Sequence, residues 1–358
     1  MNLVQKPVND ASFPLSRSTD HEACEMPAST DPPSKFDDFL GQLALRDRLL
    51  RLLRGYFHEK RFLEVQPPCL SRDCVIDAYL DPIGIPSTEL GIPQSLQSAP
   101  SPRYFLQTSA ESAMKRLLSR GAPSIFAISP VFRRAEIGAR HNIEFTMLEW
   151  YEVGGDAASA IELLGRLACQ VFGSSSYETI SYQDAFASQL GVDPVESPIE
   201  QLSERVRGID ANLASSIGPD RDSLLDVLLS QCIEPQLGRS TPTILTRYPV
   251  TQAALARRCE DDPRFAHRFE LFYRGVELAN GYDELLDADE LIRRYEVNNE
   301  IRRRGGREPL PVDTTLVAAM RRGLPPCSGV AVGVDRLQML ISDAKSIEEV
   351  IPLPITIA

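Results

Sequence analysis

The stretch that decides the fold is FRRAEIGARHNIEFTMLEWYEV, which runs from Phe132 to Val153. A turn-like segment separates two apolar runs, IFAISPVF before it and EFTMLEWYEV after it. Both runs have the pattern of strands and therefore predict a hairpin. Its connection holds far more positive charge than a turn requires, in Arg133, Arg134 and Arg140, and it also contains the polar residues His141 and Asn142. We interpret the connection as a candidate anion site; the alternative is a solvated hairpin with incidental arginines.

The second strand of this hairpin predicts a polar pocket on one face. Side chains alternate along a strand, so residues two apart share a face. One face presents Phe145, Met147, Glu149 and Tyr151, and the other presents Thr146, Leu148 and Trp150. The second set is suited to a core, whereas a carboxylate in a core is costly unless it is paired. Glu149 is therefore expected to face a pocket.

Composition places the chain among ordinary globular proteins and makes any anion site local. The chain has 358 residues, 43% of them hydrophobic and 25% charged, with a net charge of −12. The acidic balance argues against non-specific nucleic-acid binding by the whole surface. Seven cysteines, an odd number without a CxxC pair, predict reduced thiols and no zinc site. Without an apolar run of membrane length or a signal peptide, the expected location is cytoplasmic.

The order of patterns predicts one large domain behind a tail. Residues 1–35 are rich in Ser, Pro, Asp and Thr and predict a disordered N-terminal tail. Residues 36–358 then predict one domain, with a helical insertion at about 156–235. Strands that lack regular crossover helices indicate a mainly antiparallel sheet flanked by helices. The expected fold class is α+β.

A second motif, GVELANGYDEL, contains the pair Asn280–Gly281, which is typical of a two-residue hairpin turn. Such a turn would place Glu277 directly opposite Glu284, an arrangement that is destabilising unless a cation lies between them. Mg²⁺ with carboxylate and phosphate oxygens fits that arrangement. If the strand instead runs straight through, the two carboxylates fall on opposite faces and the idea fails. A solvent-exposed acidic hairpin is the further alternative.

A third motif, SGVAVGVDR, places Gly329 and Gly333 shortly before Arg336. Glycine in a strand is typical of a close approach by backbone or ligand. A packing strand with two glycines explains the motif equally well by itself. Together with the arginine-rich hairpin and the paired glutamates, the motif indicates a nucleotide site. The sequence has neither a P-loop nor a dinucleotide-binding glycine motif.

The three motifs, in this order, resemble the class II aminoacyl-tRNA synthetases over about residues 40–350. TSAE, RHNIEFTMLEWY, ELANGYDEL and GVDRL are similar to the lysyl branch. The short region before the first motif lacks room for the anticodon-binding module of that branch. The chain therefore resembles the stand-alone paralogues that activate (R)-β-lysine with ATP and attach it to a lysine of elongation factor P. Ala331, where the tRNA enzymes usually have glycine, agrees with a pocket for β-lysine.

The resemblance implies roles for individual residues. Arg133 is expected to hold the α-phosphate and, with Arg336, to be catalytic, while Arg140 or His141 reaches the outer phosphates. The ATP-binding set that the resemblance implies is Arg133, Arg134, Glu136, Asn142, Phe145, Glu277, Leu278, Gly333 and Arg336. The implied substrate-binding set is Ser109, Glu111, Glu149, Tyr151 and Glu284. Glu277 and Glu284 are the expected Mg²⁺ ligands.

The resemblance also sets expectations about partners. ATP and Mg²⁺ are the expected cofactors, lysine or (R)-β-lysine the substrate, and elongation factor P the acceptor, with no tRNA and no membrane partner. A strand ending in Pro67–Pro68 matches the dimer-interface motif of the class and implies a homodimer. Two departures are Ala135, where the family commonly has Glu, and Ala110 in place of a frequent proline. The alternative functions are charging of tRNA with a separate anticodon module and a catalytically silent regulatory paralogue.

Overall fold

The computed structural model describes residues 35–93 and 103–358, so the expected tail lies outside the described residues except for its last position. The described strands are β1 Leu63–Glu64, β2 Leu70–Ser71, β3 Gly84–Pro86, β4 Arg103–Leu106, β5 Ile125–Phe132, β6 Glu144–Val153, β7 Glu178–Ser181, β8 Thr243–Pro249, β9 Phe265–Tyr273, β10 Val276–Asp283 and β11 Cys327–Gly333. The described α-helices are α1 Lys35–Glu59, α2 Glu111–Leu118, α3 Ala157–Phe172, α4 Tyr182–Leu190, α5 Ile199–Ile209, α6 Ala211–Ile217, α7 Arg221–Leu228, α8 Ala288–Arg304, α9 Thr315–Arg322 and α10 Val334–Ile341.

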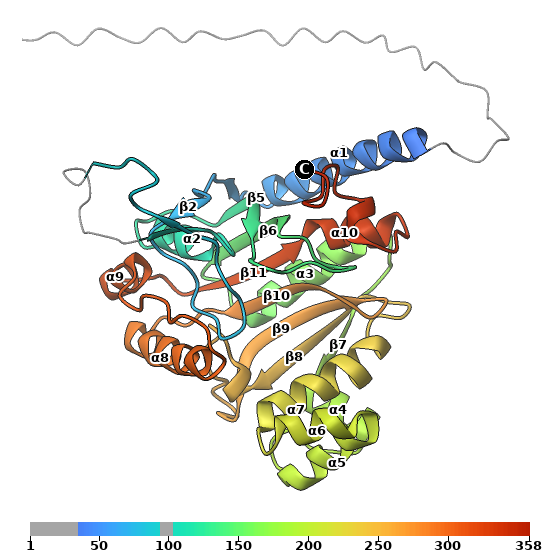
Figure 1. The fold of residues 1–358 in the computed structure, drawn as a ribbon. Helices are drawn as coiled ribbons and strands as arrows, with labels where there is room; N and C mark the ends of the chain where they lie inside the picture. The colour runs from blue at the N-terminus through green and yellow to red at the C-terminus, as the bar shows by residue number, and fades with distance from the viewer. Residues whose placement is uncertain (1–34, 94–102) are drawn as a thin grey trace, which may run out of the picture.

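One large sheet forms the centre of the molecule (Figure 1). Its eight strands lie in the order β1-β5-β6-β11-β10-β9-β8-β7. The inner strands pair antiparallel, whereas β1 and β7 at the two edges each pair parallel to their neighbour. A small sheet, β2-β4-β3, lies beside it. The predicted α+β class, with a mainly antiparallel sheet and flanking helices, is confirmed.

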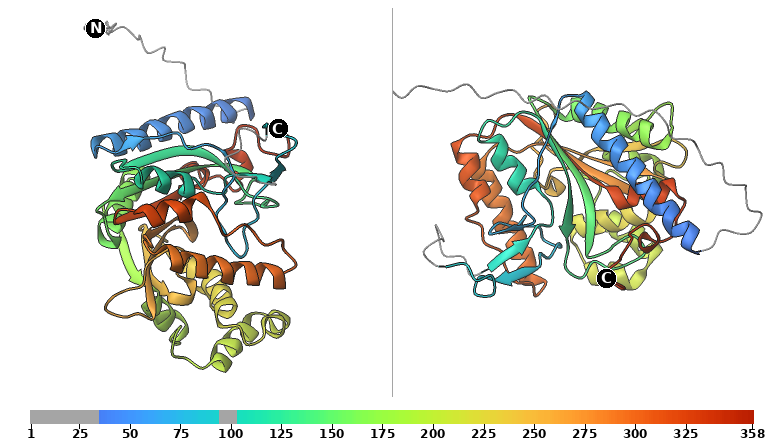
Figure 2. Two further views of the ribbon diagram at one scale, coloured as in Figure 1. Left: turned by 90° about the vertical axis from the view of Figure 1, so that its left-hand side faces the viewer. Right: turned by 90° about the horizontal axis from the view of Figure 1, so that it is seen from above.

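Three helices cover one face of the large sheet. Helices α1, α3 and α10 pack there around a core that includes Phe57, Trp150 and Leu337. Figure 2 shows α1 running across the top of the molecule. Phe126 and Trp150, which pair across β5 and β6, are both fully buried in this core. The predicted hairpin is confirmed, and its Leu148–Trp150 side is the core side, as the alternation requires.

The opposite face of the sheet is covered only in part. Helices α2, α8 and α9 pack over Ile125, Ala127 and Cys327 at the β5–β11 side. Helix α2 presents Glu111, Met114, Lys115 and Leu118 to the protein interior, which is the i, i+3, i+4, i+7 stripe of a packed helix. The rest of this face, along β6, β11 and β10, lines the cavities described below.

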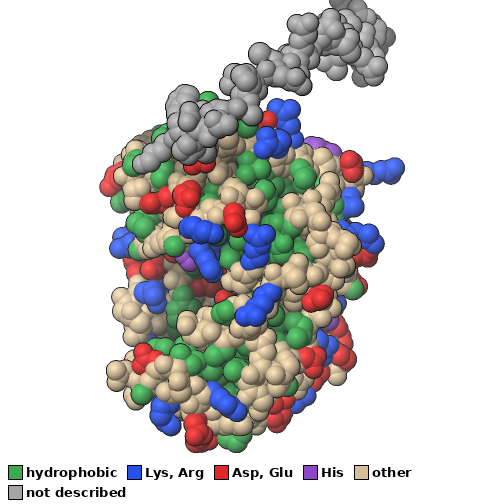
Figure 3. Space-filling model, turned by 90° about the vertical axis from the view of Figure 1, so that its right-hand side faces the viewer, with side chains coloured by type: hydrophobic (Ala, Val, Ile, Leu, Met, Phe, Trp, Pro, Cys, Tyr) green, Lys and Arg blue, Asp and Glu red, His purple; other side chains and the backbone are tan. Residues whose placement is uncertain are grey.

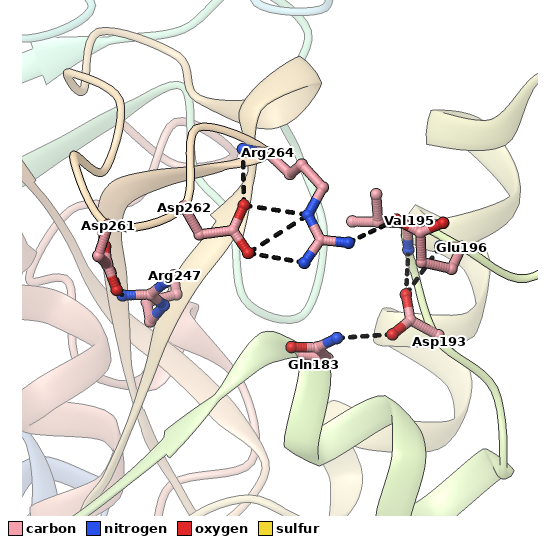
Figure 4. A network of polar contacts seen from close by, with 8 residues as sticks. All are labelled: Gln183, Asp193, Val195, Glu196, Arg247, Asp261, Asp262 and Arg264. Carbon is pink, nitrogen blue, oxygen red and sulfur yellow. Dashed lines mark hydrogen bonds and ion pairs between the residues drawn. The ribbon is translucent and has the colours of Figure 1, made fainter.

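Helices α4–α7 form a separate cluster at the β7–β8 edge (Figure 1). They pack around their own apolar core, which reaches the sheet through Leu245, Tyr248 and Phe272. By contrast, α3 belongs to the core of the large sheet. Figure 4 shows a polar network that joins the cluster to the segment before β9. In it Arg264 pairs with Asp262 at 2.7 Å and with Glu196 of the helical cluster.

The prediction of a hairpin turn at Asn280–Gly281 is wrong. Both residues lie inside β10, and the turn lies earlier, at Arg274–Gly275 between β9 and β10. These two residues have φ angles of 51° and 70°, the left-handed pair that suits a tight turn between twisted strands. Gly281 is needed for packing instead, because a Cβ there would overlap the Phe269 ring of β9. Close approach of a neighbouring side chain, rather than a turn, explains this glycine.

The strand runs straight through, yet Glu277 and Glu284 do not fall on opposite faces. The pairing of β10 with β9 shifts between Glu277 and Ala279, so Leu278 is the extra residue of a β-bulge. One extra residue reverses the alternation of side chains. Glu277 consequently shares a face with Asn280 and Glu284, and all three reach the cavities on that face.

Candidate active site

Two adjoining cavities lie on the partly covered face of the sheet. The first has a volume of about 350 Å³ and is walled by the β5–β6 connection, β10 and the start of α10. The second has a volume of about 220 Å³ and lies deeper, between β6, β10, β11 and α2. The residues that line both cavities are Asp77, Leu80, Arg133, Met147, Asn280 and Ala331. The two cavities therefore form one continuous site.

The first cavity has three guanidinium groups in its wall, those of Arg133, Arg140 and Arg336. The carboxylates that line the same cavity are Asp77, Glu136, Glu277 and Asp335. Figure 3 shows basic and acidic side chains side by side on one face of the molecule. The three arginines can bind a polyanion in spite of the net charge of −12, and the carboxylates leave room for a cation beside it.

Arg133 occupies the boundary between the cavities. Its guanidinium lies 5.0 Å from the centroid of the Phe145 ring and 3.6 Å from the Glu136 carboxylate. Its buried Nε has no hydrogen-bond partner among the described residues. A buried donor without a partner is costly and indicates a site for a ligand acceptor. An anion held by Arg133 would touch the contents of both cavities.

Arg336 also lines the first cavity, and two contacts fix the position of its guanidinium. Its guanidinium donates to the Glu277 carbonyl at 3.0 Å and lies 2.8 Å from Nε2 of His141. Burial, followed by the neighbouring guanidinium of Arg336, lowers the pKa of His141 below its usual value. His141 is therefore a neutral hydrogen-bonding group near neutral pH rather than a second cation.

The second cavity is acidic. Glu149 is buried at its wall and accepts hydrogen bonds from the Ala110 backbone N–H at 2.7 Å and from Ser109 Oγ at 2.9 Å. Burial raises the pKa of Glu149 to about 7, although these two hydrogen bonds oppose the shift. Glu111, Glu284 and Asp77 are the other carboxylates of this cavity. Four carboxylates around 220 Å³ suit a ligand that carries ammonium groups.

An unexpected cation, Lys115, lies between two of these carboxylates. Its Nζ is 2.5 Å from Glu111 Oε1 and 2.5 Å from Glu284 Oε2. Its side chain is only 2% exposed, so this ion pair is shielded from water. Burial alone lowers the pKa of Lys115, but the two carboxylates outweigh burial and raise it above its usual value. Lys115 therefore stays protonated.

The structure brings the expected residues to two places. All the expected ATP-binding residues except Arg134 line the first cavity, and all five expected substrate-binding residues line the second. The side chain of Arg134 is exposed and lies at neither wall. Ala135 has a φ of 63°, so the connection turns there, and the next residue, Glu136, reaches the cavity. These placements do not by themselves assign a role to any residue.

Carboxylates near the first cavity are the candidates for holding a cation. Glu277 lines the cavity with a side chain 41% exposed, 3.5 Å from Arg336. Burial raises the pKa of Glu234 to about 7, and the nearby charges of Glu270 and Glu277 add to that rise. Within residues 35–93 and 103–358, no group of three or more His, Cys, Asp and Glu side chains is close enough to hold a metal. A Mg²⁺ site here would therefore need phosphate oxygens as well.

Sequence reasoning missed several residues of the site. Lys115 had a visible signal, because a lysine in the apolar stripe of a helix, four residues after a glutamate, needs a partner inside the protein. Asp77, Tyr79 and Leu80 reach the site from a loop before β3 that has no periodic pattern. Arg268 of β9 lines the second cavity and pairs with Glu270 at 2.5 Å. Only the pairing of β9 with its neighbouring strands brings Arg268 to the second cavity.

None of the helices in the described part of the chain combines the length and the apolar character that crossing a membrane requires.

Comparison with known proteins agrees with this geometry. The family model for class II tRNA synthetases (D, K and N) matches residues 37–357. A protein of Yersinia pestis (strain Pestoides F) named elongation factor P–(R)-β-lysine ligase is 38% identical over 319 residues, which cover 89% of this chain and 96% of that protein. A protein of the same name from Yersinia pseudotuberculosis serotype O:1b (strain IP 31758) gives the same identity and coverage.

Proposed function

The chain belongs to the class II tRNA synthetase (D, K and N) family, and we propose that it activates (R)-β-lysine as an acyl-adenylate and transfers it to a lysine side chain of elongation factor P. The protein is thus an ATP-dependent amino acid ligase related to lysyl-tRNA synthetase. The observation that carries this proposal is the junction at Arg133. There a cavity with three arginines meets a cavity with four carboxylates, which suits the joining of a triphosphate to a diamino acid.

We assign the triphosphate and adenosine of ATP to the first cavity. Arg133 would contact the α-phosphate, and Arg140 or His141 the outer phosphates. The Phe145 ring would stack on the adenine, with Arg336 on its other side, since guanidinium groups and aromatic rings both stack on planar bases. Asn142 would hold the adenosine, and Gly333 leaves room for it, because a Cβ there would meet only Arg336 at 3.8 Å.

We assign the diamino acid to the second cavity. Its ammonium groups would lie among Glu111, Glu149 and Glu284, and its carboxylate would point to Arg133. Glu284 Oε1 is buried and lacks a hydrogen-bond donor among the described residues, as expected of a group that awaits a ligand ammonium. Ala331 lines both cavities at their boundary, where the carbon skeleton of the substrate would pass.

We propose that Mg²⁺ accompanies ATP and that Glu277 is its protein ligand. The carboxylate lines the first cavity, and one or two carboxylates with phosphate oxygens are the usual Mg²⁺ environment. Glu284, the other expected ligand, is already paired with Lys115 in the second cavity. The geometry thus favours Glu284 as a substrate ligand, while burial and the charge of Glu277 both raise the pKa of the neighbouring carboxyls of Glu234 and Glu270. The ion would neutralise charge on the leaving pyrophosphate.

The proposed chemistry needs positioning more than a protein nucleophile. A carboxylate oxygen of the substrate attacks the α-phosphorus, and the bond to the β-phosphate breaks and releases pyrophosphate. The amine of the acceptor lysine then attacks the carbonyl carbon, and the bond to AMP breaks. The amine loses its proton to the departing phosphate. Arg133 and Arg336 stabilise the negative charge that develops during the first step.

Intact-mass measurement of elongation factor P tests this function directly. After incubation with the protein, ATP, Mg²⁺ and (R)-β-lysine, the acceptor is expected to gain the mass of one lysyl unit, and to gain it more slowly with α-lysine. The control is the same incubation without ATP. An unchanged acceptor, together with charging of tRNA in a parallel reaction, would contradict the proposal. The names of the relatives do not favour charging of tRNA.

We further propose that the protein is a cytoplasmic homodimer that does not use tRNA. Exposed apolar side chains at the β1 edge, Leu63 among them, support an interface there, as do Phe39 and Leu40 on α1. Sedimentation at micromolar concentration is expected to show a species of twice the chain mass. A profile with monomer alone would contradict the dimer.

A further inference from the structure

We infer that Lys115 is a positioning residue of the substrate pocket, whose ammonium group pairs with Glu111 and Glu284 and holds both carboxylates in place for a diamino acid. This inference rests on the proposed function, because it assumes that the second cavity receives the substrate. Lys115 itself lines neither cavity. It acts through the two carboxylates that do line the second one.

The contacts leave half of each carboxylate free for a ligand. Lys115 Nζ pairs with Oε1 of Glu111 and with Oε2 of Glu284, each at 2.5 Å. Glu284 Oε1 stays buried without a donor. Gly329 of β11 provides the space for this arrangement, because a Cβ there would overlap Glu284 Oε1 and the Tyr151 ring. One oxygen of Glu284 is therefore held by the protein, and the other is available to a substrate ammonium.

The pocket is rich in carboxylates, which suits a substrate with ammonium groups. Asp77, Glu111, Glu149 and Glu284 line it, and Lys115 lies behind two of them. Arg268 also lines the pocket but is paired with Glu270, which leaves Arg133 for the substrate carboxylate. Without Lys115, two buried carboxylates would face each other, and such a pair holds a proton at neutral pH. That proton would compete with the substrate ammonium for the same oxygens.

No other described cation pairs with Glu111 or Glu284. The titratable groups that face the pair from the packed elements are Glu149 and Tyr151 of β6, Tyr282 and Asp283 of β10, Tyr295 of α8 and Cys327 of β11. Arg268 and Arg133 also line the cavity, but Arg268 is paired with Glu270 and Arg133 with Glu136. Among the described residues, Lys115 is therefore the cation in direct contact with Glu111 and Glu284.

The variant Lys115→Met keeps an unbranched side chain that lacks only the terminal ammonium group in length, and it removes the charge. In pyrophosphate exchange at pH 8, we expect the KM for (R)-β-lysine or lysine to rise at least about tenfold, because a charge-assisted contact network is lost. The KM for ATP should change less than about threefold, since Lys115 touches no residue of the first cavity. Lys60→Met is the matched control, because Lys60 is exposed and lies outside both cavities. Equal KM values for Lys115→Met and the wild type would overturn the inference.

Thermal unfolding gives a second measurement that needs no substrate. Burial raises the pKa of the Glu284 carboxyl, and the charge of Lys115 opposes this rise. In Lys115→Met the opposition is lost and the folded-state pKa rises further above the unfolded value, so more stability is lost as the pH rises above that unfolded value. The melting temperature should therefore fall by at least about 5 °C more at pH 8 than at pH 5.5. Equal losses at both pH values would indicate packing alone and overturn the inference.

The double variant Lys115→Met/Glu284→Gln covers the case in which the single variant does not fold. It removes one of the facing carboxylates, so it should be more stable than Lys115→Met at pH 8. A double variant that is no more stable, or that also fails to fold, would overturn the counter-ion role. An absence of exchange activity in the wild-type protein would instead count against the proposed function. The stability measurements would still test the counter-ion role of Lys115, because they need no substrate.

Discussion

Replacing Arg133 by alanine is expected to reduce amino-acid-dependent pyrophosphate exchange about a thousandfold or more while the protein stays folded. This thousandfold reduction is of the order seen when an enzyme loses one group that stabilises negative charge in a transition state. Arg133 lines both cavities, so its guanidinium can contact the α-phosphate and the substrate carboxylate together. No other arginine of the described chain lines both the cationic cavity and the acidic one. Water in its place would be neutral and would lack its fixed orientation.

The folded state should tolerate this change, because Arg133 makes few structural contacts. Its partners within the protein are the Glu136 carboxylate at 3.6 Å and the Phe145 ring. Circular dichroism and thermal unfolding should therefore resemble those of the wild type. Arg120→Ala is the matched control, since Arg120 is exposed and lines neither cavity. Exchange within about tenfold of the wild type in a folded Arg133→Ala protein would show that the α-phosphate contact is misplaced.

Replacing Gly329 by alanine is expected to raise the KM for the amino acid about a hundredfold or to abolish its activation. The new methyl group would overlap the carboxylate of Glu284 and the ring of Tyr151, both of which are buried. Neither the carboxylate nor the ring can move away from the methyl group, because Lys115 pairs with Glu284 and the Tyr151 ring is packed in the core. Overpacking of this kind costs about 1–3 kcal/mol, and here the displaced groups are the proposed substrate ligands.

Calorimetry of substrate binding and thermal unfolding together test this effect. The ATP affinity should change little, since Gly329 lines only the second cavity. Gly208→Ala is the control, because a Cβ at this position of α5 would meet no atom within 4 Å. That control should keep or slightly raise stability, as alanine favours a helix over glycine. Unchanged amino acid affinity in Gly329→Ala would show that the substrate does not use the Glu284 end of the cavity.

Elements with a regular pattern were predictable from the sequence. The face of β6 that presents Glu149 and Tyr151 to the site followed from alternation alone. The candidate ATP and substrate residues could be proposed because motifs name chemical types at fixed spacings. Arg134 is the exception, since it lies within the motif but its exposed side chain lines neither cavity.

The β9–β10 turn shows why other features could not be predicted. Asn280–Gly281 has the composition of a turn, yet both residues lie within β10. The glycine is needed there because a Cβ at Gly281 would overlap the Phe269 ring. Arg274–Gly275 forms the turn because the strand pairing of β9 and β10 requires two left-handed residues there. The bulge at Leu278 depends on the same pairing. Local sequence cannot choose between these registers, since the choice depends on packing across neighbouring strands.

The sequence by itself determined the α+β class, the strand faces and the chemical kinds of residue in the site. Only the tertiary structure decided that Glu277 and Glu284 share a face, that Arg133 joins two cavities and that Lys115 lies between Glu111 and Glu284. The physical reason is the range of the interactions. Alternation and helical period act between residues a few positions apart, whereas the Lys115–Glu284 ion pair joins α2 to the end of β10. Its geometry exists only once the core has brought these elements together.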